Sequence, residues 1–253
     1  MWKVVYERLR QGHRTHAYPR LAPTLPARFR GRPELRAEAC ADCAGSCAAA
    51  CPVQALQCGA VPVMDLGRCL FCGACARACP AQAITFGPDF RLAASARADL
   101  QVSSGQPPHA LQPLDAVRRR LYGRSFKLRQ VSAGGCNACE ADANVLSTLA
   151  FDMGRFGISF VASPRHADAL LVTGPVTRNM REALLKTYDA LAEPKVVIAS
   201  GACAIDGGPY HGGEEVEAGG VAALIPVDLF VPGCPPHPWT LLDGMLRLLG
   251  VVG

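Results

Sequence analysis

The chain has 253 residues, of which 50% are hydrophobic, and a net charge of +5. This is enough apolar sequence for one large domain or two smaller ones. The first sixteen residues, MWKVVYERLRQGHRTH, are broken by charges, so neither a signal segment nor a disulfide framework is expected for the thirteen cysteines. No apolar run reaches the roughly 18 residues of a membrane span, and no nucleic-acid-binding pattern is visible. We therefore predict two domains in which reduced cysteines bind metal.

Residues 1–36 form a basic N-terminal arm. They include nine Lys or Arg residues but only two acidic residues, Glu7 and Glu34. Apolar residues recur there at helical spacing, namely Trp2, Val5 and Leu9. Such a pattern is typical of a helix that lies on an anionic membrane surface or docks on a partner subunit. The charge pattern leaves a solvated terminus open as the alternative.

The sequence between residues 40 and 87 contains an internal repeat. CADCAGSCAAACPVQALQCG (40–59) aligns with CLFCGACARACPAQAITFG (69–87). The offset from Cys47 to Cys75 is 28 residues, whereas the offset from Cys43 to Cys72 is 29, so one residue is inserted between Cys43 and Cys47. The second copy fits C-x2-C-x2-C-x3-C-P, the run of bacterial-type ferredoxins, whose fourth cysteine ligates the other cluster.

The repeat predicts an α+β ferredoxin domain over residues 37–90 with two [4Fe–4S] clusters and exchanged fourth ligands. The first site consists of Cys40, Cys43, Cys47 and Cys79. The second site consists of Cys69, Cys72, Cys75 and Cys51. Structural zinc sites also use C-x2-C pairs, but they have no use for the doubled C-P ending. Cys58 is left over, and its place opposite Phe86 predicts a buried apolar residue rather than a ninth ligand.

Residues 91–124 are expected to be a linker, because RLAASARADLQVSSGQPPHALQP (91–113) has no sustained period. Residues 125–253 then alternate between strand-like and helix-like segments, which predicts an α/β domain with a mainly parallel, flavodoxin-like sheet. The expected strands are Phe126–Val131, Ile158–Ala162, Ala169–Thr173, Lys195–Ser200 and Ala223–Val231. The expected helices are near Glu140–Arg155, Arg178–Ala192 and Pro238–Leu249.

Four more cysteines follow predicted strands of this second domain. They are Cys136 and Cys139 in GGCNACE, Cys203 in SGAC and Cys234 in VPGCPP. The carboxyl ends of parallel strands line one crevice, so these thiolates are expected to converge and form a third [4Fe–4S] site. Glycines beside them suit a close approach of backbone to cluster, namely Gly134, Gly135, Gly201 and Gly233. Ordinary burial is the alternative for any one of these cysteines.

Both parts of the chain resemble one family. GGCNACE, ASPRHADALLVTGPVT, SGAC and VPGCPPHP resemble the small subunit of membrane-bound [NiFe]-hydrogenases of the formate hydrogenlyase type, which is homologous to the small subunit of respiratory complex I. FRGRPE and LGRCLFCGACARACP resemble the two-cluster ferredoxin subunit of the same complexes, so the chain looks like a fusion of the two. Complex I homologues have adjacent cysteines where this chain has Cys136 and Cys139 followed by Glu140, the hydrogenase arrangement. Ala138 and His237 depart from the pattern of many relatives.

The resemblance implies an oxidoreductase component that relays electrons through three [4Fe–4S] clusters. The third would be the proximal cluster, facing a Ni–Fe centre on a separate large subunit that interconverts protons and hydrogen. Glu140 would lie near that interface and take part in proton transfer; its alternative role is to stabilise the first turn of a helix. The runner-up function is electron wiring in a complex I-like quinone reductase or a nickel-free relative, and a zinc-stabilised binding protein is a further alternative.

The same resemblance implies a peripheral place on the cytoplasmic face of the inner (cell) membrane. The expected partners are the hydrogenase-type large subunit and other complex I-like peripheral and membrane subunits. The electron donor would be a formate- or carbon-monoxide-oxidising unit or a soluble ferredoxin. Nucleic acid is not expected as a partner.

Overall fold

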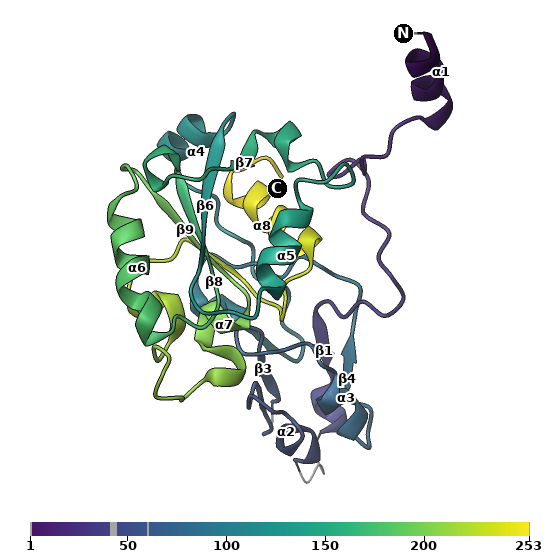
Figure 1. The fold of residues 1–253 in the computed structure, drawn as a ribbon. Helices are drawn as coiled ribbons and strands as arrows, with labels where there is room; N and C mark the ends of the chain where they lie inside the picture. The colour runs from purple at the N-terminus through teal and green to yellow at the C-terminus, as the bar shows by residue number, and fades with distance from the viewer. Residues whose placement is uncertain (1, 41–44, 60, 253) are drawn as a thin grey trace.

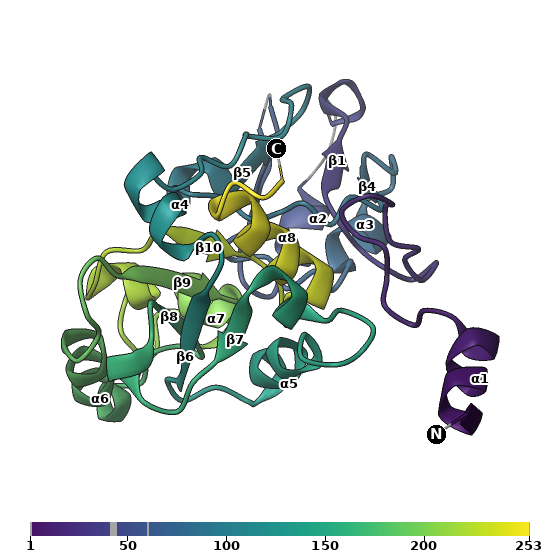
Figure 2. The ribbon, with the colours of Figure 1, turned by 90° about the horizontal axis from the view of Figure 1, so that it is seen from above.

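The computed structural model describes residues 2–40, 45–59 and 61–252. An N-terminal arm leads into a small ferredoxin unit, which packs against a larger α/β unit (Figure 1). The arm begins with the helix α1 (Trp2–Gln11), as the spacing of its apolar residues predicts. No residue of α1 is buried, and both views show this helix standing clear of the body (Figures 1 and 2). None of the helices in the described parts of the chain is long and apolar enough to span a bilayer.

Further along, the arm is not a solvated tail. Tyr18 is buried, and its ring packs 5.2 Å from the ring of Trp239 and 5.9 Å from that of Phe90, measured between centroids. The Tyr18 hydroxyl donates a hydrogen bond to the buried carboxylate of Asp243. These contacts fasten the arm to the C-terminal helix of the α/β unit.

The ferredoxin unit repeats itself in three dimensions. Two short helices hold its cysteine loops, α2 (Ser46–Ala49) and α3 (Ala74–Ala78). Each begins at a left-handed glycine, with φ 75° at Gly45 and φ 71° at Gly73. Two small antiparallel sheets flank the helices, one with order β1-β4 and one with order β2-β3-β5. Their strands are β1 (Pro33–Leu35), β2 (Leu56–Gln57), β3 (Val63–Asp65), β4 (Ile84–Phe86) and β5 (Gln101–Ser103).

The α/β unit is built on a five-stranded parallel sheet with the order β10-β9-β8-β6-β7. Taken in chain order, this is the 2-1-3-4-5 arrangement of flavodoxin-like folds, so the predicted fold class is confirmed. The strands are β6 (Phe126–Ser132), β7 (Ile158–Phe160), β8 (Ala169–Thr173), β9 (Val196–Ser200) and β10 (Leu229–Val231). Every residue of β8 and β9 is buried, as expected where both faces of a sheet are covered.

Helices cover the two faces of this sheet (Figure 1). The helices of the unit are α4 (Ala116–Tyr122), α5 (Ala138–Val145), α6 (Arg178–Asp189), α7 (Ala202–Asp206) and α8 (Pro238–Leu248). Alternate residues of β8 point into two different cores. Leu170 and Val172 share a core with α6, α7 and the ferredoxin unit, whereas Leu171 packs with α5 and α8. One hydrophobic core therefore runs from the sheet into the ferredoxin unit.

Three expectations from the sequence need correction. The expected strand over Ala223–Val231 is β10 alone, because Gly220–Ala223 forms a 3-10 helix. The expected helix over Glu140–Arg155 ends at Val145, with a separate 3-10 helix at Met153–Phe156. The expected linker over 91–124 is only partly a linker, because it contains β5, which pairs with β3, and α4. Its residue Ala94 also bonds through its backbone to Phe230 at the edge of the larger sheet.

Ion pairs join the two units. Arg97, which is held on the ferredoxin side by hydrogen bonds of 2.7 and 2.6 Å to Asp65, lies 3.8 Å from Asp206 of the α/β unit. Arg68 of the ferredoxin unit lies 3.0 Å from the carboxylate of Asp206 at the end of α7. Gly67 lies inside this contact, because an added Cβ would sit 2.7 Å from the Arg97 guanidinium. The pairing fixes the ferredoxin unit next to the helix that contains Cys203.

Candidate functional site

Four thiols from three segments of the chain line one cavity at the carboxyl edge of the parallel sheet. The cavity is narrow, with a volume of about 20 Å³. Its cysteines are Cys136 after β6, Cys139 in α5, Cys203 in α7 and Cys234 after β10. The strand order reverses between β6 and β8, which is where doubly wound sheets bind ligands. The structure therefore brings together all four residues of the third site.

Glycines let the backbone come close to these thiols. Gly201 has φ 95°, and a Cβ added there would lie 2.7 Å from the Sγ atom of Cys139. A Cβ on Gly208 would lie 2.8 Å from the Sγ atom of Cys203. Gly174 faces Gly135 so closely that a Cβ would lie 2.5 Å from the Gly135 nitrogen. The loops can close around the cavity only because these positions lack side chains.

The electrostatics of the third site suit a positively charged inorganic core. Burial, followed by the nearby Cys203 thiol, raises the pKa of Cys139 to about 12. Burial and Cys234 raise the pKa of Cys203 to about 11. Thiols that resist ionisation alone become thiolates when a metal centre compensates their charge. Four cysteine thiols are the donor set that iron–sulfur clusters use, so the chemistry of the site fits such a group.

Glu140 lies at the base of the third site. It is the third residue of α5, and its side chain is only 6% exposed. Burial alone would raise its pKa, but hydrogen bonds from Ser132, Thr173 and its own backbone N–H outweigh burial and hold the pKa below its usual value. The Thr173 hydroxyl donates at 2.6 Å to the Glu140 Oε1 atom. Ser132 and Thr173 end their strands, so only the sheet register identifies them as partners.

The second site is also assembled, across the repeat. Burial raises the pKa of Cys69 to about 12, and the Cys75, Cys51 and Cys72 thiols add to this effect. Those four are the predicted ligands, so the cysteine before the proline in the first copy does reach the loop of the second. Backbone amides point at two of the sulfurs, with Phe71 N–H donating to Cys69 at 3.3 Å and Ala55 N–H donating to Cys51 at 3.2 Å.

Three of the four predicted ligands of the first site are among the described residues. Cys43 lies outside the described residues, whereas Cys40, Cys47 and Cys79 lie in the same core as the second site. The Ala83 N–H donates to the Cys79 sulfur at 3.3 Å, as Ala55 does to Cys51 in the other copy. The expectation that Cys58 is buried is wrong, because its side chain is exposed. Its Sγ atom nevertheless lies 3.4 Å from that of Cys47, so it borders the first site.

The second and third sites approach each other. The Cys72 thiol is close enough to contribute to the raised pKa of Cys234, after burial and Cys136. Both cysteines line a cavity of about 400 Å³ between the two units. His237, which departs from the pattern of relatives, lines this cavity too and begins α8, with its Nδ1 atom accepting the Trp239 N–H at 3.2 Å.

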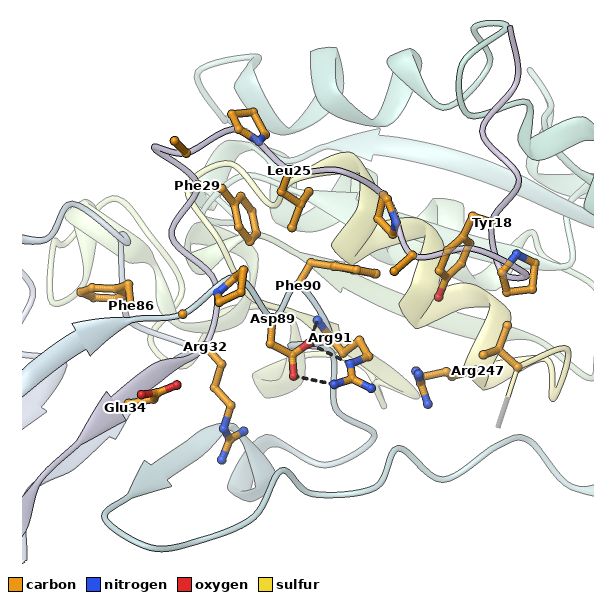
Figure 3. A pocket seen from close by; sticks show the side chains of 18 residues that line it. Tyr18, Leu25, Phe29, Arg32, Glu34, Phe86, Asp89, Phe90, Arg91 and Arg247 are labelled. Atoms are coloured by element: carbon orange, nitrogen blue, oxygen red, sulfur yellow. Dashed lines mark hydrogen bonds and ion pairs between the residues drawn. The ribbon is translucent and has the colours of Figure 1, made fainter. Parts of the chain in front are cut away.

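A larger cavity, of about 880 Å³, lies where the arm crosses the body (Figure 3). Its wall combines rings such as Phe29 and Phe90 with the arginines Arg32, Arg91 and Arg247. Figure 3 shows Arg91 clasping Asp89, with Nε to Oδ1 at 2.8 Å. No cysteine is among the described residues of its wall, so this cavity is separate from the three cysteine sites.

A flavodoxin-like sheet with four thiols along its carboxyl edge, joined to a repeated cysteine-loop unit, defines an iron–sulfur protein. Residues 62–85 match the 4Fe-4S binding domain, and residues 136–248 match the family described as NADH ubiquinone oxidoreductase, 20 kDa subunit. The chain belongs to this 20 kDa subunit family, to which a ferredoxin unit is fused.

Named proteins of other organisms are similar to the second half of the chain. Over 129 residues, 51% of this chain, it is 44% identical to half of formate hydrogenlyase subunit 7 of Escherichia coli. Over 130 residues, also 51% of this chain, it is 42% identical to 77% of the probable membrane-bound hydrogenase subunit mbhJ of Pyrococcus furiosus. Over 119 residues, 47% of this chain, it is 44% identical to 49% of NAD(P)H-quinone oxidoreductase subunit K of Prochlorococcus marinus.

The match thus spans about half the length of two of these three relatives. Among solved structures, a chain of the archaeal membrane-bound sulfane sulfur reductase is 30% identical. That comparison covers 55% of this chain and 76% of the other, with a TM-score of 0.47. The named relatives are oxidoreductase subunits, and the resemblance to hydrogenase and complex I-like subunits is confirmed.

Proposed function

We propose that this chain relays electrons through three [4Fe–4S] clusters to or from a Ni–Fe centre on a separate large subunit. The observation that supports this most is the convergence of Cys136, Cys139, Cys203 and Cys234 on one cavity, with Cys72 of the second site beside it. The relatives named as hydrogenase subunits supply the endpoint, the interconversion of protons and hydrogen.

The chain's own residues hold, shield and polarise the clusters. Bound at these sites, the clusters would take up and release single electrons. Cysteines on short loops and helix starts fix the ligand positions, so little rearrangement is needed when charge arrives. The backbone amides of Ala55, Phe71 and Ala83 donate to ligand sulfurs and stabilise negative charge there. Burial of Cys47, Cys69, Cys75 and Cys79 keeps water from the centre of the ferredoxin unit.

The cysteine count supports a nickel site on another chain. Twelve of the thirteen cysteines belong to the three sites, and only Cys58 remains. A Ni–Fe centre needs a set of thiolates that this sequence cannot supply. The large subunit is therefore proposed as the partner at the third site, together with other complex I-like peripheral and membrane subunits. A formate- or carbon-monoxide-oxidising unit or a soluble ferredoxin would deliver or receive electrons at the ferredoxin unit.

The proposed location is the cytoplasmic face of the cell membrane, where the chain would be peripheral. The helix α1 supports this, because Trp2 and Leu9 are 85% and 79% exposed on its apolar face while Lys3, Arg8 and Arg10 supply positive charge. Full-length protein should co-sediment with vesicles containing anionic lipid, and less so after Trp2→Ser/Leu9→Ser. Val117→Ser/Leu121→Ser, which alters two similarly exposed residues of α4, is the matched control. Equal sedimentation of both variants would exclude α1 as the contact.

The test of the function is anaerobic co-purification of the chain with its large subunit, followed by metal analysis. Nickel in the partner and iron in this chain are expected, with hydrogen turnover abolished in Cys139→Ser. Full turnover in that variant would overturn the assignment of the third site. Zinc without iron, and a colourless protein, would overturn the electron-transfer role altogether.

A second candidate function is electron wiring in a complex I-like quinone reductase or a nickel-free relative. It is favoured by the 44% identity to NAD(P)H-quinone oxidoreductase subunit K. The spacing of Cys136 and Cys139 favours the hydrogenase instead. A partner large subunit that contains no nickel and supports quinone reduction would decide for this second function.

Glu140 is proposed to take part in proton transfer at the third site. Its carboxylate lines the cavity and is buried, which supports a protected proton path. Its hydroxyl partners favour the ionised form, so it would accept a proton only transiently. In Glu140→Gln, hydrogen turnover should fall while dithionite still reduces the clusters. Unchanged turnover would limit Glu140 to stabilising the start of α5.

A further inference from the structure

We propose that Arg30 and Arg77 raise the reduction potential of the cluster at the second site, so that an electron is stabilised beside the third site. The inference rests on the proposed electron relay and adds two residues to it. Neither arginine is a ligand, and both act through the loop that holds Cys72.

Two guanidinium groups donate hydrogen bonds to this loop. The Nη1 atom of Arg30 donates to the carbonyl of Phe71 at 3.2 Å, and the Nη1 atom of Arg77 donates to the carbonyl of Cys72 at 3.1 Å. Arg30 comes from the N-terminal arm and Arg77 from α3, so distant parts of the chain meet at two consecutive carbonyls.

The loop is shaped to admit both groups. A Cβ added to Gly73 would lie 3.0 Å from the Nε atom of Arg30 and 3.4 Å from the Nη1 atom of Arg77. The glycine therefore leaves the space that the two side chains fill.

Arg77 distinguishes the two copies of the repeat in sequence. With the 28-residue offset, Ala49 stands where Arg77 stands in the second copy, CAAAC against CARAC. The first site has a different cation nearby, because Arg36 donates to the carbonyl of Gln82 in the turn after Cys79. Arg30 and Arg77 therefore act on the second cluster in particular.

Charge and polarisation act in the same direction. In each transfer the first cluster loses one electron and the second gains it, with no bond broken and no proton moved. A nearby cation stabilises the added negative charge. In addition, a carbonyl that accepts a strong hydrogen bond makes the N–H of the same peptide a better donor. The peptides concerned contain the N–H groups of Cys72 and Gly73, inside the ligand loop.

The position of the pair matches the direction of transfer. Arg30 lines the cavity of about 400 Å³ that separates Cys72 from Cys234. Phe29 anchors this part of the arm, because its ring packs on that of His237 with centroids 5.1 Å apart. Asp142 is the acidic residue among the described residues of that wall. An electron held by the second site is therefore held where the third site can receive it.

The test is an anaerobic redox titration of the full chain, followed by electron paramagnetic resonance, which reports each cluster without any hydrogenase activity. Arg30→Gln and Arg77→Gln should each lower the potential of the second cluster, and the double variant should change the equilibrium between first and second clusters by about tenfold. Tenfold is about 59 mV for a one-electron couple. Both arginines are exposed, so the shift should shrink at high salt, which a purely structural effect would not do.

Two further variants sharpen the result. Arg20→Gln, on an exposed part of the same arm, should leave all potentials unchanged, and Ala49→Arg should raise the potential of the first cluster. Intact cluster signals with unshifted potentials in the two single variants would overturn this inference alone. Absence of cluster signals in the wild-type chain would overturn the proposed function and this inference with it.

Discussion

Gly201→Ala tests whether the third site is as tightly built as its geometry indicates. The backbone there has φ 95° and ψ 154°, a region that residues with a side chain avoid at a cost of about 1–3 kcal/mol. The new Cβ would also lie 2.7 Å from the Cys139 sulfur, where ordinary contact starts at about 3.4 Å. Overpacking of this kind adds about 1–3 kcal/mol. The sulfur must therefore retreat by more than the roughly 0.5 Å that a preorganised site tolerates.

The expected result is loss of one cluster of three, seen as a fall of about one third in iron and sulfide after anaerobic reconstitution. Gly212→Ala is the matched control, because its φ is also positive, at 77°, but no described atom lies within 4 Å of the new Cβ. It should lose stability in thermal unfolding by about 1–2 kcal/mol and keep all its iron. Full iron content in Gly201→Ala, with stability no lower than in the control, would refute the close packing of this glycine against a ligand.

Asp206→Asn should lower the free energy of unfolding by about 1–2 kcal/mol in urea titrations, because the half-buried Arg68 loses its ion pair; an effect that salt does not reduce would contradict an electrostatic cause. Cys58→Ala should keep the full iron content, since its exposed thiol is not one of the twelve predicted ligands, and loss of iron would make it a ligand of the first site. Glu140→Gln should cost about 1–3 kcal/mol at pH 7, because the hydrogen bond from Thr173 loses its charged acceptor. The pKa of Glu140 is lower in the folded protein than its usual value of 4.5, so the charged carboxylate stabilises the fold fully above pH 4.5. This stabilisation is lost as the pH falls through the folded pKa, and the difference in stability between wild type and variant should therefore vanish in acid.

The cysteine spacing alone predicted most of what is local in this molecule. The C-x2-C-x2-C-x3-C-P run predicted the two loop-and-helix copies and the position of Cys51 beside the loop of the second copy, because short spacings leave the backbone few ways to present their thiols. The alternation of buried strands and helices likewise predicted the flavodoxin-like sheet. It failed at β10 and at the expected linker, because the strands that pair with β10 and β5, namely β9 and β3, lie elsewhere along the chain and leave no local signal.

The tertiary structure decided how the parts meet. Cys72 and Cys234 are separated by most of the α/β unit in sequence, and they face one cavity only because the Arg68–Asp206 contact and a shared core dock the ferredoxin unit beside α7. The hydrogen bond from Arg30 to the Phe71 carbonyl could not be predicted from the sequence either, because there the arm is only a run of basic residues. Spacing specifies ligands because bonds along the chain limit their separation, whereas contacts between distant segments depend on how whole surfaces pack.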